Sequence, residues 1–289
     1  RSCHRAPVQT SRRAPRQHVI VSLLQAAPEM RLPVSDLGEG SSATLKAMER
    51  AGLIRLELEE VRRDPEADGI GEVTETLPLT LNAEQKAALE AILAECGSPA
   101  PKPQLLLGVT GSGKTEVYLQ AARHVLDLGK TVLVLVPEIS LTPQTVRRFK
   151  ARFASMQSQV AVLHSNLSQG ERFDEWHRIR KGEARIVIGA RSAVFAPLPD
   201  LGLILVDEEH ENTYKQENVP RYHGRDVAVL RAAFEKCAIV LGSATPSLES
   251  WQNTQTGKYG LLRLNQRADG QSMPLVRVVD MRLEASKHK

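Results

Sequence analysis

The stretch QLLLGVTGSGKTEVYL, residues 104–119, decides the fold. Within it, residues 108–115 fit the pattern GxxxxGK[ST], which forms a phosphate-binding loop (P-loop) when a strand precedes it and a helix follows it. The apolar run 104–107 predicts that strand, and the residues after Lys114 predict that helix. The sequence therefore places the motif in the structural context that it requires.

Apolar runs without polar alternation recur along the chain and are separated by helical stretches. They lie at residues 104–107, 131–136, 160–163, 185–188, 203–206 and 238–241. Such runs are typical of strands buried on both faces of a parallel sheet, with helices as right-handed crossovers between them. The sequence therefore predicts a doubly wound α/β domain with a parallel sheet over residues 81–283, followed by a tail at 284–289.

A small domain is expected ahead of the α/β domain, over residues 17–63. The apolar residues between Val19 and Leu24 predict a helix, and a second helix carries Leu45, Met48 and Ala51 on its inner face. Alternating apolar and charged residues follow, which predicts a β-ribbon. The order resembles a winged helix, although a packing domain with no DNA role fits the pattern equally well.

Two segments of this chain lack apolar periodicity. Residues 1–16 are rich in Arg, Ser and Pro, which predicts a flexible basic tail. Residues 64–80 begin with an acidic stretch that contains Pro65, Gly69 and Gly71, which predicts a linker. The chain begins at Arg1, and we expect it to be a piece of a longer polypeptide.

Composition limits the class of protein. A hydrophobic content of 42%, a charged content of 25% and a net charge of +4 fit a globular protein and are compatible with a nucleic-acid partner. No apolar run approaches the ~20 residues that a membrane helix needs, so we expect no membrane association. Cys3, Cys96 and Cys237 are widely spaced, which predicts a cytoplasmic protein without disulfides or a zinc site, and we interpret Cys96 and Cys237 as small apolar residues.

The P-loop predicts a nucleotide site. Its glycines let the backbone fold around phosphate oxygens, with amide groups pointing at the anion. Lys114 is expected to hold the β- and γ-phosphates, and the Thr115 hydroxyl is expected to bind Mg²⁺. The candidate nucleotide-binding residues are Gly108, Thr110, Gly111, Ser112, Gly113, Lys114, Thr115 and Glu116.

An acidic cluster follows the apolar run 203–206 and has the form of a Walker B motif. Ligands of open α/β sheets bind at the carboxyl ends of the strands, where Asp207 and Glu208 are expected. Asp207 would complete the Mg²⁺ site with Thr115, and Glu208 would orient and deprotonate an attacking water. We therefore predict ATP and Mg²⁺ as ligands, with Lys114, Asp207 and Glu208 as the catalytic residues.

Several further motifs carry a family resemblance. The runs DEEH and GSAT resemble motifs II and III of superfamily-2 helicases. Together with GVTGSGKTEVYL, VPEISLTPQ, HSNLSQGER, GARSAVFAPL, DEEHENTYKQE, PRYHGRDVAVLRA and GSATPSLES, over roughly 81–283, they resemble the family of PriA-like replication-restart helicases. The resemblance implies a RecA-like first helicase lobe of an ATP-dependent 3′-to-5′ DNA helicase. It also implies single-stranded and forked DNA, single-strand-binding protein and primosome proteins as partners.

The resemblance also implies roles for residues outside the P-loop and the acidic cluster. Gln85 matches the glutamine that reads adenine, and the loops 137–144 and 189–192 match motifs Ia and Ib, which grip the DNA backbone. An aromatic-rich loop after motif II would stack on unpaired bases and report to the hydrolytic site. The implied DNA-contacting or coupling residues are Arg191, Ser192, His210, Tyr214, Lys215, Arg221, Tyr222, His223, Arg225, Ser243 and Thr245.

The chain departs from the family pattern, because an amino-terminal DNA-binding domain, a second lobe and a zinc-binding cysteine cluster are absent from it. Without the arginines of the second lobe, we expect this chain to bind nucleotide but to hydrolyse it poorly. We expect a monomer, and we interpret Phe149, Phe153, Trp176 and Trp251 as core residues. Alternative functions are a P-loop kinase or nucleotide switch, another superfamily-2 DNA translocase, and a non-enzymatic DNA-fork platform.

Overall fold

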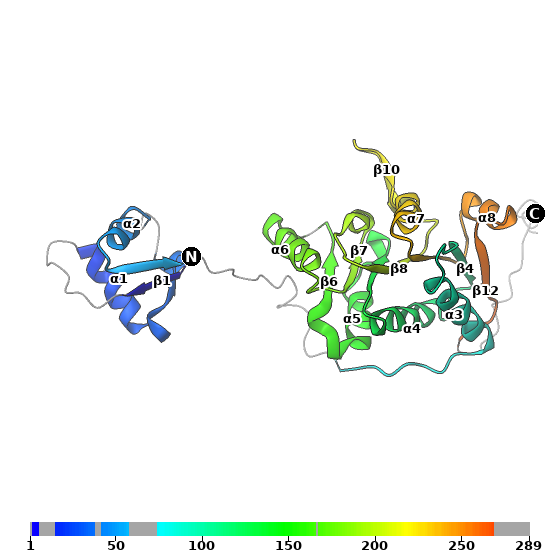
Figure 1. Cartoon of the computed structure of the whole chain (residues 1–289), viewed down its shortest axis with the longest axis horizontal. Coiled ribbons are helices and arrows are strands. Elements are labelled where there is room, and N and C mark those ends of the chain that lie inside the picture. The colour runs from blue at the N-terminus through cyan, green and yellow to red at the C-terminus, as the bar shows by residue number, and fades with distance from the viewer. Residues whose placement is uncertain (1, 6–14, 38–41, 58–73, 166, 269–289) are drawn as a thin grey trace, which may run out of the picture. The chain divides into compact units, whose positions relative to one another are not determined.

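A computed structural model of the chain describes residues 2–5, 15–37, 42–57, 74–165 and 167–268. Contacts between residues divide the chain into two compact units, Arg1–Arg62 and Arg63–Lys289 (Figure 1). No helix of the described residues is both long and apolar enough to cross a bilayer, and no group of three or more His, Cys, Asp or Glu side chains among them is arranged to hold a metal ion.

The first unit is a small antiparallel sheet with two helices. Its strands are β1 (Ser2–Arg5), β2 (Leu32–Pro33) and β3 (Ile54–Glu57), in the order β2-β1-β3. Its helices are α1 (Pro15–Ala26) and α2 (Ser42–Arg50), accompanied by the short 3-10 helices η1 (Pro28–Met30) and η2 (Val34–Leu37). Leu24, Leu45 and Met48 form its core, whereas Ala51, predicted on the inner face, is exposed. The winged-helix interpretation stays a prediction.

The prediction of a flexible tail over residues 1–16 is wrong for both of its described parts. Ser2–Arg5 is the central strand of the small sheet, paired with β2 and with β3. Pro15 and Arg16 already belong to α1. The strand escapes prediction because its four residues show no apolar pattern, and their pairing depends on two segments more than 25 residues away. Residues 6–14 lie outside the described residues.

The second unit is built on a seven-stranded sheet in the order β12-β4-β11-β8-β5-β7-β6. Every neighbouring pair in this sheet is parallel. The strands are β4 (Gln104–Gly108), β5 (Thr131–Leu135), β6 (Val160–Leu163), β7 (Ile186–Gly189), β8 (Leu201–Val206), β11 (Ala238–Ser243) and β12 (Gly260–Leu264). The six predicted strands are confirmed, and β12 is an edge strand that was not predicted.

Helices cover both faces of this sheet. They are α3 (Ala83–Cys96), α4 (Lys114–Asp127), α5 (Pro143–Arg152), α6 (Gln169–Arg180), α7 (Gly224–Glu235) and α8 (Leu248–Gln255), with the 3-10 helices η3 (Glu138–Ser140), η4 (Ala154–Gln159), η5 (Arg191–Phe195) and η6 (Asn212–Tyr214). One core joins α3, α4 and α5 to one face, and a second joins α6, η5 and α7 to the other (Figure 1). Alternate strand residues point to opposite cores, as for Leu205 and Val206. The doubly wound α/β prediction is confirmed.

The aromatic residues predicted as core divide into three groups. Phe149 and Phe153 are buried, as predicted. Trp251 is half-buried against the core beneath α7. The prediction that Trp176 is a core residue is wrong, because its side chain is 39% exposed on α6. The Arg180 guanidinium lies over its ring at 5.3 Å from the ring centre. Helical spacing alone does not distinguish such a stacked surface pair from a core position.

The end of the predicted linker is attached to the second unit. Residues 74–80 form no helix or strand, but the Leu79 amide donates to Glu116 Oε1 at 3.0 Å and the Thr76 amide donates to the Ala151 carbonyl. Glu116 also receives two hydrogen bonds from Arg152, at 2.8 and 2.7 Å. Burial opposes ionisation of the Glu116 carboxyl, but the hydrogen bonds from Arg152 and Gln120 outweigh it and lower its pKa. Glu116 thus ties α4 to α5 and to the incoming chain.

Substituting Arg152 with methionine is expected to destabilise the second unit by roughly 3–5 kcal/mol, because Glu116 would keep a buried charge without its partner. Urea denaturation followed by circular dichroism measures the change. The matched control is Arg148→Met on the same helix, where the side chain is exposed, and which should change the free energy of unfolding by less than ~0.5 kcal/mol. Equal stability of the two variants would contradict the structural role of this ion pair.

Cys96 and Cys237 are expected to be unreactive in the folded chain. Burial raises the pKa of Cys96 to about 11 and that of Cys237 to about 12. Because only the thiolate attacks iodoacetamide, Cys96 at pH 8 should react roughly a hundred-fold more slowly than an unfolded thiol. Peptide mapping by mass spectrometry, with and without urea, measures the labelling. Rapid native labelling of Cys237 would show that the core is open.

Candidate functional site

The P-loop connects β4 to α4 at the carboxyl edge of the sheet. Gly111 and Gly113 have φ of +79° and +81°, a left-handed backbone that favours glycine. Gly108 is packed so closely that a Cβ atom there would meet Ser112 Oγ at 2.5 Å. Ser112 Oγ is buried and has no hydrogen-bond partner within the described chain. A buried hydroxyl and a free helix start fit an anionic oxygen ligand.

Gln85 lies against the P-loop from the start of α3. Its Nε2 donates to the Ser112 carbonyl at 2.8 Å, and its Oε1 accepts from the Asn82 amide in a capping box. The side chain is therefore buried and shared between the helix cap and the P-loop. On the same side of the loop, the Ala268 amide donates to the Gly111 carbonyl at 2.8 Å, so the chain after β12 also contacts the P-loop.

Lys114 and the acidic residues after β8 meet at one end of the sheet. Lys114 Nζ donates to the Gly108 carbonyl at 3.1 Å and lies 3.6 Å from Glu208 Oε1. The Lys114 side chain is largely buried, whereas Glu208 is about one-third exposed. The Lys114 ammonium and the Glu208 carboxylate thus meet beside the P-loop, although 94 positions (208 − 114) separate the two residues in the sequence.

Asp207 is held in place from α4. The Tyr118 hydroxyl lies 3.3 Å from Asp207 Oδ1, and this contact is possible because residue 242 on β11 is glycine. A Cβ atom at Gly242 would collide with the Tyr118 hydroxyl. Burial and the neighbouring Glu208 carboxylate raise the pKa of Asp207, and the positive charge of Lys114 opposes them. A divalent cation would relieve this crowding of negative charge, and the Thr115 hydroxyl and Asp207 carboxylate are oxygen donors of the kind that Mg²⁺ prefers.

Glu208 and His210 connect the acidic turn to the loop after β11. Glu208 has a φ of +43°, which is unusual for a residue with a side chain and is held by the hydrogen-bonded residues around it. His210 Nδ1 lies 2.7 Å from Ser243 Oγ and 3.6 Å from Glu208 Oε2. His210 Nε2 lies 3.4 Å from Thr245 Oγ1. The predicted coupling residues His210, Ser243 and Thr245 are therefore adjacent.

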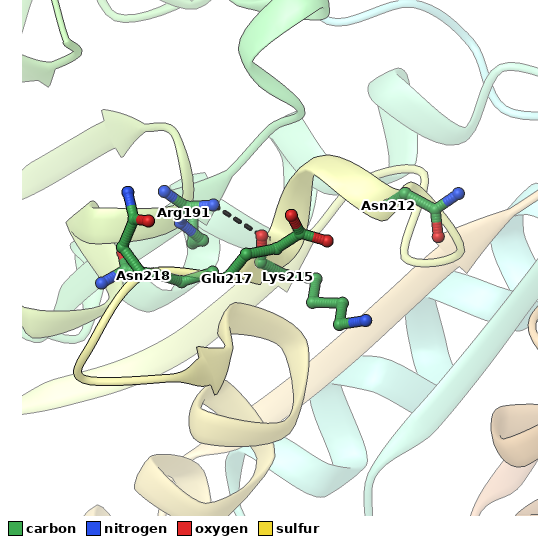
Figure 2. Close-up of a pocket in the computed structure, with 6 residues that line it drawn as sticks. Arg191, Asn212, Lys215, Glu217 and Asn218 are labelled. Carbon is green, nitrogen blue, oxygen red and sulfur yellow. Dashed lines mark hydrogen bonds between the residues drawn. The ribbon is translucent and has the colours of Figure 1, made fainter.

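A short hairpin follows the acidic turn and consists of β9 (Lys215–Gln216) and β10 (Tyr222–His223). Figure 1 shows β10 projecting from the rest of the unit. A cavity of about 720 Å³ opens beside it, which we call the hairpin pocket. The pocket is lined by Arg191, Asn212, Lys215, Gln216, Glu217 and Asn218 (Figure 2).

Arg191 joins η5 to the hairpin. Its Nη1 donates to the Lys215 carbonyl at 2.7 Å, the bond drawn in Figure 2, and its guanidinium lies 5.9 Å from the Tyr222 ring centre. Tyr222 also makes an edge contact with Phe195. Burial and the nearby Arg225 guanidinium lower the pKa of His223. A second cavity, of about 530 Å³, lies along Lys215, Arg221 and Tyr222.

Three predicted contact residues are placed differently from the rest. Tyr214, expected to stack on bases, is 0% exposed, and Arg225, expected to touch phosphate, is 8% exposed. Both predictions of direct DNA contact are wrong, because these side chains bond to the acidic turn. Glu116 is directed to Arg152 and Leu79, so its carboxylate is occupied away from the P-loop. Ser192, Lys215 and Arg221 are exposed, in keeping with a contact surface.

Some residues of the site were not predicted from sequence. Phe195 is 58% exposed beside Tyr222 and extends the aromatic surface of the hairpin. Tyr118 and Gly242 support Asp207, and Glu209 is fully buried behind Glu208. Phe195 could have been found from its position, because it is an aromatic residue three positions after the motif Ib segment 189–192. The others depend on contacts between distant segments.

The chain is similar to several known proteins. The model of the DEAD/DEAH box helicase family matches residues 82–254. The chain is 52% identical over 278 residues to the replication restart protein PriA of Bacillus subtilis, covering 95% of this chain and 34% of that protein. It is 49% identical over 213 residues to PriA of Treponema pallidum, covering 74% and 32%. A solved structure of RecG bound to a three-way DNA junction matches with a TM-score of 0.49 and 25% identity, covering 73% and 27%. The chain thus spans about a third of the length of the curated relatives it matches.

Proposed function

This chain belongs to the DEAD/DEAH box helicase family, and from that membership we propose that it is the ATP-binding first lobe of a 3′-to-5′ DNA helicase of replication restart, with an amino-terminal winged-helix domain. The observation that carries the proposal is the placement of Lys114 Nζ 3.6 Å from Glu208 Oε1 beside the P-loop. The hairpin pocket follows the same acidic turn along the chain. One lobe therefore offers a nucleotide site and a candidate DNA site that share a turn.

The residues of the nucleotide site have separate tasks in this proposal. Lys114 and the P-loop amides bind the phosphate oxygens of ATP. Thr115 and Asp207 would hold Mg²⁺, which neutralises phosphate charge when bound. Glu208 Oε1 and Oε2 orient a water and accept its proton. The Gln85 side chain donates to the Ser112 carbonyl and so supports the P-loop, at the place where we propose that adenine binds.

The exposed residues near the hairpin are suited to single-stranded DNA. The exposed Ser192, Lys215 and Arg221 and the half-buried Arg191 supply donors for phosphates. The half-buried Tyr222 with the exposed Phe195 supplies ring faces for bases. We propose single-stranded and forked DNA as partners on this basis. His210 with Ser243 and Thr245 would connect the nucleotide state to the second lobe of a longer protein.

Further features of the proposal follow from similarity to the curated relatives. They are a role in restarting replication at stalled forks, single-strand-binding protein and primosome proteins as partners, a zinc site outside this chain, and a cytoplasmic location with the chromosome. By resemblance, the arginines that complete hydrolysis come from a second lobe, so we propose that residues 1–289 alone bind ATP but hydrolyse it slowly.

The test is the ATPase rate of the longer protein with forked DNA, with single-stranded DNA and without DNA. The proposal expects strong stimulation by both DNAs and a rate for the isolated chain that is lower by roughly 10³–10⁵-fold. A non-enzymatic fork platform would bind the fork without any stimulation. Vigorous turnover by the isolated chain would contradict the proposed dependence on a second lobe.

A further inference from the structure

The chain that leaves β12 runs beside the P-loop. β12 pairs in parallel with β4 (Figure 1), and its last residue, Leu264, lies opposite Gly108, the first residue of the P-loop. The Val109 amide donates to the Leu264 carbonyl at 3.2 Å. Because the two strands point the same way, residues 265–268, which we call the exit segment, emerge at the edge of the sheet where ligands bind.

The exit segment is held against the start of α3. Glu84 Oε2 accepts from the Asn265 amide at 2.7 Å and from the Gln266 amide at 3.2 Å. Glu84 Oε1 accepts from Asn265 Nδ2 at 3.1 Å. Glu84 directly precedes Gln85, the glutamine that by resemblance reads adenine. These hydrogen bonds therefore place the exit segment beside the proposed adenine side of the site.

Gln85 and the exit segment approach the P-loop from the same side. A Cβ atom at Gly113 would meet both Gln85 Nε2 and Ala268 Cβ. Gln85 Nε2 donates to the Ser112 carbonyl, and the Ala268 amide donates to the Gly111 carbonyl at 2.8 Å. Because the amides of a P-loop point at the phosphates, groups that donate to its carbonyls approach from the side away from the phosphates.

Arg267 lies flat on the P-loop at Gly111. A Cβ atom at Gly111 would lie 3.5 Å from Arg267 Nη2 and 3.6 Å from both its Cζ and its Nε. A point that is almost equally distant from a carbon and from two nitrogens bonded to it lies above their plane. The guanidinium therefore turns a flat face to the loop. Arg267 is half-buried, so part of its side chain is accessible to solvent.

We propose that Arg267 is a nucleotide-contacting residue that stacks on the base of bound ATP. The inference rests on the proposed function and deepens it, because it adds a residue of the exit segment to the adenine side of the nucleotide site. A guanidinium is planar and stacks on aromatic faces such as a purine. Arg267 is on the side of the loop that Gln85 occupies, so its contact is with the base and not with the phosphates. Stacking does not depend on the groups that a purine carries, so Arg267 would hold the base and Gln85 would identify it.

The test compares a ligand that has a base with one that has none, in the 289-residue chain. Displacement of a fluorescent ATP analogue gives the Kd of AMP-PNP and of inorganic tripolyphosphate, each with Mg²⁺. Arg267→Met removes the guanidinium and keeps an unbranched side chain. It is expected to weaken AMP-PNP binding by roughly 3- to 30-fold, the range of a cation stacked on a ring. Its affinity for tripolyphosphate should change by less than about two-fold.

Two further variants separate the plane of the guanidinium from its charge. Arg267→Lys keeps the charge without the plane and should recover only part of the lost affinity for AMP-PNP. The matched control is Arg263→Met, which removes an exposed arginine of β12 whose guanidinium lies 5.8 Å from the centre of the Trp251 ring. It makes the same change in net charge and should bind both ligands like the parent.

Equal weakening of AMP-PNP and tripolyphosphate in Arg267→Met would show that Arg267 acts on the phosphates or on the loop, and would overturn the inference. Parent-like AMP-PNP binding in Arg267→Met or in Arg267→Lys would overturn it too. These results leave the proposed function intact. A parent chain that binds neither ligand would overturn the proposed function and the inference together. If only AMP-PNP binds to the parent, the comparison of Arg267→Met with Arg267→Lys decides.

Discussion

Replacing Lys114 with alanine is expected to weaken ATP binding by roughly 10- to 150-fold, the equivalent of losing a charged hydrogen bond worth about 1.5–3 kcal/mol. Lys114 Nζ is the cation that faces Glu208 at 3.6 Å. Its removal takes away the charge that attracts the phosphates and leaves the Glu208 carboxylate to repel them. Titration of the chain with a fluorescent ATP analogue measures the Kd.

The control for this prediction is Lys258→Ala, which removes an exposed lysine between α8 and β12. That variant carries the same change in net charge and should bind the analogue like the parent. Circular dichroism should show the same helix content in both variants. If Lys114→Ala and Lys258→Ala bound the analogue equally well, Lys114 would have no role in phosphate binding.

Replacing Glu208 with glutamine is expected to slow ATP hydrolysis by the longer protein by about 10²–10⁴-fold, the usual contribution of a general base. Glutamine keeps the size of the side chain but cannot accept a proton from water. Nucleotide affinity should stay the same or rise slightly, because a negative charge beside the phosphates is removed. Single-turnover phosphate release, with DNA present, measures the rate without interference from product release.

Glu211→Gln provides the comparison for Glu208, because Glu211 is a partly exposed carboxylate on the same turn, 3.8 Å from His210 Nε2. It should change the rate by less than about ten-fold. A Glu208→Gln rate within that same range would show that another residue is the general base. The assignment of the P-loop would not be affected.

The sheet was predictable where burial alone defines a strand. Leu203 to Val206 lies between two layers of helices, so every residue of the run is apolar and the pattern needs no neighbour to be recognised. β12 sits at the edge, contains the exposed Arg263 and pairs only with β4, so its short sequence resembles a loop. β1 was not predicted for a related reason: its pairing with β2 and β3 is a tertiary contact, which the sequence of four residues does not reveal.

The site was predictable where spacing along the chain fixes the chemistry. Gly108 to Thr115 is one loop with one geometry, and Asp207 and Glu208 leave a buried strand at the edge where ligands bind. The positions of Tyr214 and Arg225 follow no such local rule. Their aromatic and basic character predicted DNA contact, but the neighbouring carbonyl of Asp207 and carboxylate of Glu209 satisfy them in the interior. Glu209 could not be assigned a role from sequence, because the run DEEH contains three adjacent acidic residues and the pattern does not show which of them is buried.

If the P-loop and Asp207 hold one magnesium nucleotide between them, isothermal titration calorimetry with AMP-PNP will show a gain in affinity from Mg²⁺ that depends on the Asp207 carboxylate. Parent chain and Asp207→Asn are titrated in Mg²⁺ and again in EDTA. We expect Mg²⁺ to strengthen binding to the parent chain and this gain to be lost in Asp207→Asn. An equal gain from Mg²⁺ in both proteins would show that Asp207 does not face the bound ion and that the two motifs do not form one site.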